Sequence, residues 1–233
     1  MGEDFPSSLQ QRETLQWLTE SYPLRLTGND NHEVILHRFV LELFFKTTSR
    51  WLSQRIVCAW EGIICGPGRD SRLVTSMINN VDFAPNLVLR GTFPSELGLL
   101  TTLTKLEPSF SPLLGGCIPT EIGMLTALTY LQLISNRLTG TNTSEIGNLR
   151  ELSFLLLEDN LISGPIPSEI GELSTQLLYA FFQGNHLSGP VPSELGRLTV
   201  LQMLQLQCNL GLDPNVPAEL GNVSVQIGNS SCC

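Results

Sequence analysis

Leucine and isoleucine recur along this chain with a spacing of 24 or 25 residues, from Ile78 to about Leu220. The clearest of the six units consists of Leu128, Leu131, Leu133, Asn136, Leu138 and Gly140. Self-similarity at this period predicts a solenoid of stacked turns, in which each turn buries its apolar residues against its neighbours. Such a fold has a long open face rather than a deep cleft, and faces of this kind usually bind other macromolecules.

Each unit has the form L-x-x-L-x-L-x-x-N, which predicts a short strand followed by a turn. The two inner apolar positions alternate with exposed ones, as in a strand with one buried face. The amide of the following Asn can satisfy backbone groups inside the turn, so a buried ladder is expected. The ladder positions are Asn86, Asn136, Asn160, Asn185 and Asn209, with Ser111 in the second repeat. Because Pro108 also falls in the second repeat, we expect that turn to be the least regular.

A Leu-x-Gly segment and then a hydrophobic-Pro pair follow the strand. Gly permits a positive φ, and Pro suits the first position of a helical turn because it has no amide hydrogen. The first helical turns carry Glu96, Glu121, Glu145, Glu169, Glu194 and Glu219. These carboxylates either stabilise the helix starts or form a negative row that recruits a cation or a basic partner. In the third repeat, Asn142 and Thr143 replace the hydrophobic-Pro pair.

The consensus L-x-x-L-x-L-x-x-N-x-L-x-G-x-I-P-x-x-L-G-x-L resembles the plant-type leucine-rich repeat of receptor-like proteins and polygalacturonase inhibitors. Just before the repeats, the segment from Cys58 to Cys65 reads C-A-W-E-G-I-I-C and is similar to that family's N-terminal cap. The resemblance implies an α/β fold: a right-handed leucine-rich-repeat solenoid with a parallel concave sheet, six repeats and a helical N-terminal cap. It also implies a Cys58–Cys65 disulfide in the cap that covers the apolar end of the first turn.

We divide the chain into four segments. Residues 1–30 are a helical and linker extension, residues 31–77 a helix plus the cap, residues 78–221 the six repeats, and residues 222–233 a C-terminal cap. Helices are expected from about Ser8 to Glu20 and from about His32 to Lys46. The second helix either packs on the first repeats or binds a partner.

Cysteines and glycosylation sequons indicate the compartment. Besides Cys58 and Cys65, Cys208 can pair with Cys232 or Cys233 to hold the C-terminal cap, and Cys117 is expected to be a free core thiol. The N-x-[ST] sequons begin at Asn142, Asn222 and Asn229, and the side chain of Asn142 is expected to face solvent. These features favour an oxidising, extracellular environment. Reduced cysteines and accidental sequons are the alternative.

The N-terminal residues do not have the apolar segment of a signal peptide. No stretch approaches the roughly 20 apolar residues of a membrane span. The chain is therefore either a piece of a longer protein with an upstream signal or membrane segment, or an intracellular protein. We favour the first interpretation, with the repeats facing outside and any membrane attachment through a segment not present in this chain.

Composition excludes several classes of partner. Hydrophobic residues make up 42% and charged residues 15% of the chain, which is typical of an ordered protein. The net charge is −9, and from Ile78 onward 13 acidic residues oppose 5 basic ones. Because a nucleic-acid binder should show a basic stripe, we expect no nucleic-acid partner. Electrostatic docking on an anionic membrane surface is disfavoured for the same reason.

The sequence contains no catalytic or metal-binding motif. His32 and His37 are five residues apart and no acidic or cysteine cluster completes a metal site. Glu158 and Asp159 are adjacent carboxylates, but neighbouring strand residues point to opposite faces. We therefore expect no enzymatic activity, no cofactor and no metal.

The positions that flank the inner leucines are expected to face the concave surface. In the third to fifth repeats they form an exposed cluster of Tyr130, Phe154, Leu156, Tyr179 and Phe181. Around the cluster lie Lys105, Glu107, Gln132 and Met203, with Asn80 and Asp82 in the first repeat. Aromatic residues exposed in consecutive turns are typical of interaction hot spots. Alternatively, they only stabilise the sheet as cross-strand pairs.

Three functions fit these features. The leading one is a receptor-like or adhesion module that binds a protein or peptide ligand on its concave face, possibly together with a larger receptor. The second is a secreted inhibitor of a cell-wall hydrolase, although the concave residues are more aromatic than acidic and so suit a basic enzyme less well. The third is a structural or adhesive solenoid without a specific ligand.

Overall fold

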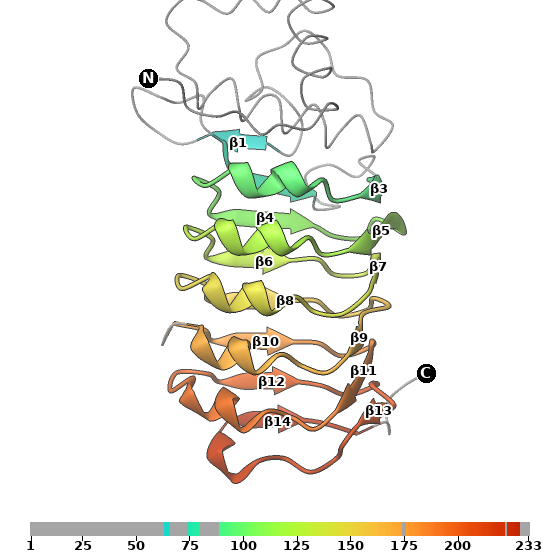
Figure 1. Ribbon diagram of the computed structural model, residues 1–233, viewed down its shortest axis with the longest axis vertical. Coiled ribbons are helices and arrows are strands. Elements are labelled where there is room, and N and C mark those ends of the chain that lie inside the picture. Colours follow the sequence, from blue (N-terminus) through green and yellow to red (C-terminus); the bar gives the residue numbers. More distant parts are fainter. Residues whose placement is uncertain (1–62, 66–73, 80–88, 174–175, 222, 229–233) are drawn as a thin grey trace, which may run out of the picture.

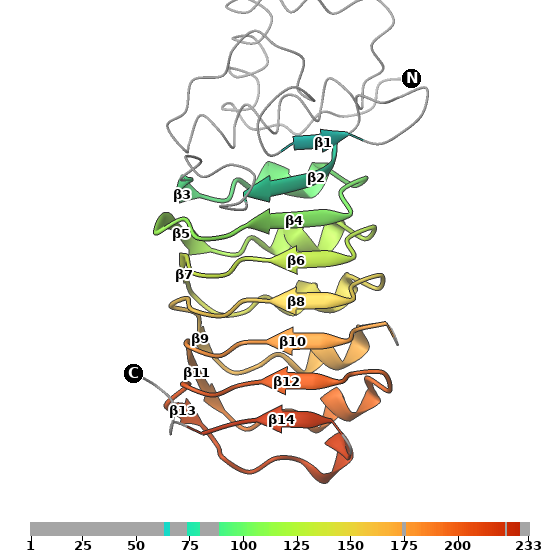
Figure 2. The ribbon, with the colours of Figure 1, turned by 180° about the vertical axis from the view of Figure 1, so that it is seen from behind.

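The chain folds into a stack of similar turns, each lying directly below the one before it (Figure 1). The structure is a computed structural model. It describes residues 63–65, 74–79, 89–173, 176–221 and 223–228, and for the first two segments only the backbone. Each turn contributes one strand to a main sheet and one short 3-10 helix to the opposite side (Figure 2). The predicted leucine-rich-repeat solenoid is confirmed.

The main sheet has eight strands in the order β1-β2-β4-β6-β8-β10-β12-β14. β1 is antiparallel to β2, and all later neighbours in this sheet are parallel. The strands are β1 (Ile63–Cys65), β2 (Val74–Asn79), β4 (Lys105–Pro108), β6 (Tyr130–Gln132), β8 (Phe154–Leu156), β10 (Tyr179–Phe181), β12 (Met203–Gln205) and β14 (Ser224–Gln226). The predicted C-terminal cap therefore contributes a further strand, β14, to the sheet.

Two small parallel sheets of three strands each lie at one edge of the stack (Figure 1). The first consists of β3 (Arg90–Thr92), β5 (Leu113–Cys117) and β7 (Arg137–Thr139), and the second of β9 (Ser163–Gly164), β11 (His186–Gly189) and β13 (Gly211–Leu212). The 3-10 helices are η2 (Ser95–Leu99), η3 (Thr120–Met124), η4 (Ser144–Asn148), η5 (Ser168–Glu172), η6 (Ser193–Arg197) and η7 (Ala218–Leu220).

Stacking of the 3-10 helices depends on a glycine in each of them from η2 to η6. A Cβ atom added at Gly171 of η5 would lie 2.3 Å from the carbonyl oxygen of Glu194 in η6, which is shorter than any real contact. The preceding prolines have extended backbones and precede the helices by one residue, so they are N-caps rather than first helical residues. The first-turn carboxylates accept bonds from adjacent hydroxyls, as Glu169 does from Ser168 at 3.2 Å. These contacts favour the helix-start interpretation of the glutamate row.

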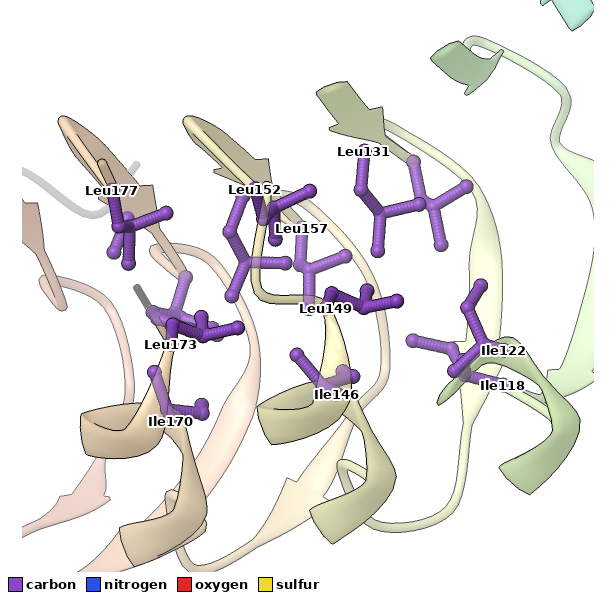
Figure 3. Close-up of a cluster of buried hydrophobic side chains, with 14 of the residues drawn as sticks. Ile118, Ile122, Leu131, Ile146, Leu149, Leu152, Leu157, Ile170, Leu173 and Leu177 are labelled. Atoms are coloured by element: carbon purple, nitrogen blue, oxygen red, sulfur yellow. The ribbon is translucent and has the colours of Figure 1, made fainter. Parts of the chain in front are cut away.

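The core runs the length of the stack between the sheet and the 3-10 helices. Figure 3 shows its repeating layers, with Leu131, Leu152 and Leu157 from the sheet side above Ile146 and Ile170 from η4 and η5. All five side chains are fully buried in the structure. Burying one such side chain stabilises the folded state by about 1.5–3 kcal/mol. The inner apolar positions thus do what the alternation predicts.

The asparagine ladder is also confirmed. The Oδ1 atom of Asn160 accepts the N–H of Leu138 at 3.1 Å, and its Nδ2 atom donates to the carbonyls of Leu133 and Leu157. The equivalent bonds are made by Asn185 and Asn209. Each asparagine therefore joins its own turn to the preceding one, which an apolar residue could not do.

The second repeat is more regular than the sequence predicts. Pro108 has no N–H to donate to the carbonyl of Gln132, but the hydroxyl of Ser109 donates to that carbonyl at 3.2 Å instead. Ser111 replaces the ladder asparagine, and its hydroxyl accepts the N–H of Leu89 at 3.1 Å. Two serines therefore keep this turn in register. The remaining irregularity is a shorter ladder between β4 and β6, which pairs only two residues of each strand.

The predicted register of the first repeat is wrong. The hydrophobic-Pro landmark places Asn80 beside Lys105 and Asp82 beside Glu107, whereas β2 pairs Ser76 with Lys105 and Ile78 with Glu107. The reason is length. The first repeat has 17 residues from Ser76 to its landmark at Phe93, while the fourth has 12 from Phe154 to Ile166. The two N-terminal helices, the extension, Trp60 and the ladder residue Asn86 lie outside the described residues.

Candidate functional site on the outer sheet face

The main sheet has one face on the core and one turned away from it, which we call the outer sheet face (Figure 2). It corresponds to the face predicted to be concave. Because the strands are parallel and in register, its side chains form rows across the repeats. One row starts each strand with Lys105, Tyr130, Phe154, Tyr179 and Met203. The next row lies two residues on, with Glu107, Gln132, Leu156, Phe181 and Gln205.

Four aromatic rings form a continuous aromatic stripe, Tyr130, Phe154, Tyr179 and Phe181. The ring centroids of Tyr130 and Phe154 are 4.9 Å apart, those of Phe154 and Tyr179 5.5 Å, and those of Tyr179 and Phe181 5.8 Å. All four side chains are half-buried. The structure therefore brings the predicted aromatic residues together, in the tilted geometry that aromatic pairs favour.

Leu156 does not belong to this exposed surface. Only 7% of its surface is accessible, although its strand position places it on the outer sheet face. In the parallel register it lies between Gln132 and Phe181, and both neighbours have longer side chains. The alternation of residues along a strand predicts the face of a side chain but not how much its neighbours cover it.

Charged residues border the stripe in the second repeat. The Nζ atom of Lys105 lies 5.8 Å from the centroid of the Tyr130 ring, within the range of a cation–π contact. Partial burial raises the pKa of Glu107, and the charge of Lys105 opposes that rise. The pKa of the Tyr130 phenol is raised by burial and by the carboxylates of Glu107 and Glu158.

Amides surround the stripe on both sides. The hydroxyl of Tyr130 donates to Gln132 at 3.0 Å, and that of Tyr179 donates to Gln202 at 3.0 Å. Beyond them, the Nε2 atom of Gln205 contacts the sulfur of Met203 at 3.3 Å. The predicted residues Gln132 and Met203 are half-buried beside the rings.

A third row of polar residues was not recognised as a site from the sequence. It continues the same strands and contains Glu158, Gln183 and Gln207, which we call the acceptor row. The side chain of Glu158 is only 9% exposed. Burial raises its pKa to about 7, its own backbone N–H opposes the rise, and the neighbouring charge of Asp159 adds to it. A carboxyl group perturbed in this way is a marker of functional sites.

The cysteines are only partly described. Cys208 is disulfide-bonded, and its partner is not among the described side chains. Cys117 is free, as expected, but it is exposed at the end of β5 and not in the core. The side chains of Cys58, Cys65 and Cys232 lie outside the described residues.

Asn142 does not face solvent as expected. Its side chain is 5% exposed, and neither amide atom has a hydrogen-bond partner among the described residues. It follows an isolated bridge between Thr141 and Ser163, and it fills the place where the other repeats bury Ile or Val. This conformation leaves no room for a glycan on that nitrogen. The other two sequons, at Asn222 and Asn229, lie outside the described residues.

Two searches of the described part of the chain found no site of another kind. None of its helices has the length and apolar character required to cross a membrane. Within the same residues, no three His, Cys, Asp or Glu side chains are grouped as a metal site would require.

Comparison with known proteins identifies the architecture through solved structures. No family model and no curated protein matches the chain. The plant peptide hormone receptor RGFR1 in complex with RGF2 is 34% identical with a TM-score of 0.62, covering 73% of this chain and 25% of its own. The ectodomain of the Arabidopsis receptor kinase HAESA, in complex with an extended IDA peptide hormone, is 30% identical with a TM-score of 0.67, covering 86% of this chain and 33% of its own.

A shorter relative matches over nearly its whole length. The Arabidopsis BIR3–SERK2 complex contains a chain that is 28% identical with a TM-score of 0.62, and the match covers 78% of this chain and 96% of that chain. In contrast, the present chain spans about a quarter of the RGFR1 chain and about a third of the HAESA chain. These matches are to plant leucine-rich-repeat ectodomains.

Proposed function

Because the chain is a plant-type leucine-rich-repeat protein, we propose that it is a non-enzymatic, receptor-like module that binds a peptide or protein ligand. The ligand occupies the outer sheet face, where the aromatic stripe is the main contact. Lys105, Glu107, Gln132 and Met203 contribute polar and apolar contacts around it.

The single observation that carries this proposal is the continuity of the stripe. Four rings from three consecutive strands lie in one contact chain on a face turned away from the core and the 3-10 helices (Figure 2). Partly exposed aromatic side chains bury a large area when a ligand covers them, and their phenol groups supply hydrogen bonds. The RGFR1 and HAESA structures, in which peptide hormones are bound, support a peptide as the ligand.

A purely structural role is the second candidate, because the same rings contact one another. Ring pairs at 4.9–5.8 Å stabilise a sheet without any ligand. Inhibition of a cell-wall hydrolase, the third candidate, needs an acidic outer face. From Lys105 to Gln205 that face carries only Glu107 as a carboxylate in its first two rows, so it fits a basic enzyme poorly.

We place the protein outside the cell or on the outer side of a membrane. The disulfide at Cys208 supports an oxidising compartment. The proposed Cys58–Cys65 bridge and glycans at Asn222 and Asn229 belong to the same proposal, and an intact-mass measurement before and after thiol labelling and deglycosylation tests them. Six free thiols and an unmodified mass would instead make the protein an intracellular scaffold.

The binding proposal is tested by selection from a displayed library of random linear peptides. The wild-type chain is expected to enrich a defined set of peptides, and the double variant Phe154→Ala, Tyr179→Ala is expected to lose them. The matched control is Met124→Ala, which removes an exposed apolar side chain from η3 on the opposite side of the stack. Thermal unfolding of each variant shows whether the fold is retained. Equal enrichment by the folded double variant would contradict the proposal.

A further inference from the structure

Three buried side-chain oxygen atoms on the outer sheet face have no hydrogen-bond donor among the described residues. They are Oε2 of Glu158, Oε1 of Gln183 and Oε1 of Gln207. They occupy one row because each follows the last residue of its strand by two positions, after β8, β10 and β12. Neighbouring strands in a sheet are about 4.8 Å apart, so the three acceptors succeed one another along the stack.

Unpaired acceptors of this kind are costly. Each buried oxygen without a donor destabilises the folded state, which is why native proteins keep few of them. Two residues further along the chain, Asn160, Asn185 and Asn209 occupy equally buried positions and are fully hydrogen-bonded. The repeat can therefore satisfy a polar row, and the acceptor row is an exception to what the same turns do elsewhere.

No cation of the chain serves Glu158. Its Oε1 side is the only part that the backbone N–H of the same residue can reach while Oε2 stays unpaired, and the one charge that shifts its pKa is the like charge of Asp159. The titratable groups on the packed strands are Tyr130 of β6 and Tyr179 of β10. The one Lys of the outer sheet face, Lys105, lies over the Tyr130 ring, on the side of the stripe away from Gln183 and Gln207.

We propose that the acceptor row is the subsite for a guanidinium group, the side chain of an arginine in the peptide ligand. This inference rests on the proposed peptide-binding function and names one chemical feature of its ligand. A guanidinium has five N–H donors in one plane and no acceptor, so it can bond to Glu158 and Gln183 at once. Its planar face can also stack on Phe181, which precedes Gln183 by two residues on the same strand.

The chemistry favours a cation over a neutral donor. A glutamine amide can turn its own NH₂ group toward a neighbour, but an ionised carboxylate can only accept. From Leu89 onward the chain has 12 acidic and 5 basic residues, which attracts a basic peptide. An amine would engage Glu158 as a point charge and leave Gln183 and Gln207 less well served than the planar guanidinium does.

The subsite has a characteristic pH dependence. The cation binds the ionised form of Glu158, and a proton competes with it because the pKa of that carboxyl is about 7 in the free protein. Affinity for the arginine peptide is therefore full well above pH 7. It falls by up to about tenfold for each pH unit below 7, until the pKa of the complex is reached.

The test compares peptides selected from the random library at about pH 8 by the full wild-type chain, by Glu158→Gln and by Glu169→Gln. The last is the same substitution on the opposite side of the stack, in η5. We expect wild type and Glu169→Gln to enrich peptides with arginine at one fixed position, and Glu158→Gln to lose that arginine. The selected peptide should bind Glu158→Gln at least tenfold more weakly, and its arginine-to-lysine form should bind wild type several-fold more weakly.

A second measurement does not depend on any variant folding. The ¹³C resonance of the Glu158 carboxyl group is titrated with and without the selected peptide, and the peptide is expected to lower its pKa. Peptides that lack a selected arginine, or an arginine that Glu158→Gln retains with equal affinity, would overturn the subsite while leaving the stripe proposal intact. Selection of no peptides at all would overturn both proposals.

Discussion

The two polar rows that follow the strands differ in one respect. Asn160, Asn185 and Asn209 have bonded amide atoms at both ends, whereas Glu158, Gln183 and Gln207, two residues earlier, each retain an unpaired oxygen. Both rows belong to the same turns and repeat with the same period. The asparagine row faces backbone groups that need partners, and the acceptor row faces the outer side of the sheet. The difference separates a row that holds the fold together from a row that is suited to a ligand.

The comparison is broken most severely by removing a ladder residue. Asn160→Ala leaves the N–H of Leu138 and the carbonyls of Leu133 and Leu157 without their partners. We expect the free energy of unfolding to fall by about 3–5 kcal/mol, measured by chemical denaturation. Glu158→Gln, two residues away, is the matched change in the other row. If it costs as much as Asn160→Ala at neutral pH, the two rows do not differ in the way described.

The second repeat tests whether a serine can do the work of the ladder asparagine. Ser111→Ala removes the acceptor of the Leu89 N–H and the donor to the Ser109 carbonyl. Because both partners are buried, the expected loss is about 1–3 kcal/mol in the free energy of unfolding. Ser95→Ala on the exposed start of η2 serves as control and should change stability by less than about 0.5 kcal/mol. An equal effect of the two substitutions would show that Ser111 is not part of the ladder.

The periodic features of the fold could be predicted from sequence because each repeat states them again. Four ladder asparagines and the aromatic stripe were located from spacing alone. The serine substitutions at Ser109 and Ser111 occur once, so no pattern showed that a hydroxyl replaces both a missing proline N–H and an asparagine amide. The register of β2 failed for a related reason, since the landmark assumes a constant repeat length.

The site was predictable by face but not by depth. Leu156 and Glu158 alternate correctly with the core residues, yet both are covered by neighbours from adjacent turns. Asn142 replaces a buried Ile or Val and keeps its buried position although its side chain is polar. Cover of this kind depends on side chains about 24 residues away, and the alternation within one strand contains no information about them.

Glu158 sharpens the comparison through pH. The protonated carboxyl is favoured in the folded chain because its pKa is about 7, against a normal value of 4.5. Its stabilising contribution is fully present below pH 4.5 and is lost as pH rises to about 7. We expect the free energy of unfolding of wild type, relative to Glu158→Gln, to fall by on the order of 1–2 kcal/mol across this window. The difference between the two proteins isolates this group, because Glu107 shifts in the same direction and Glu145 in the opposite one. A constant difference would place the pKa of Glu158 near its normal value.

The smallest expected effect is on stability alone, from Gln183→Leu. The side-chain oxygen of Gln183 has no partner among the described residues, so its removal forfeits no hydrogen bond and relieves the cost of a buried acceptor. We expect the free energy of unfolding to change by less than about 1 kcal/mol, in the stabilising direction. Asn185→Leu, two residues on, should instead destabilise strongly because it removes bonds to Ile162, Leu157 and Phe182. A large loss in Gln183→Leu would mean that this side chain supports the fold, and the acceptor row would then have a structural role like that of the ladder.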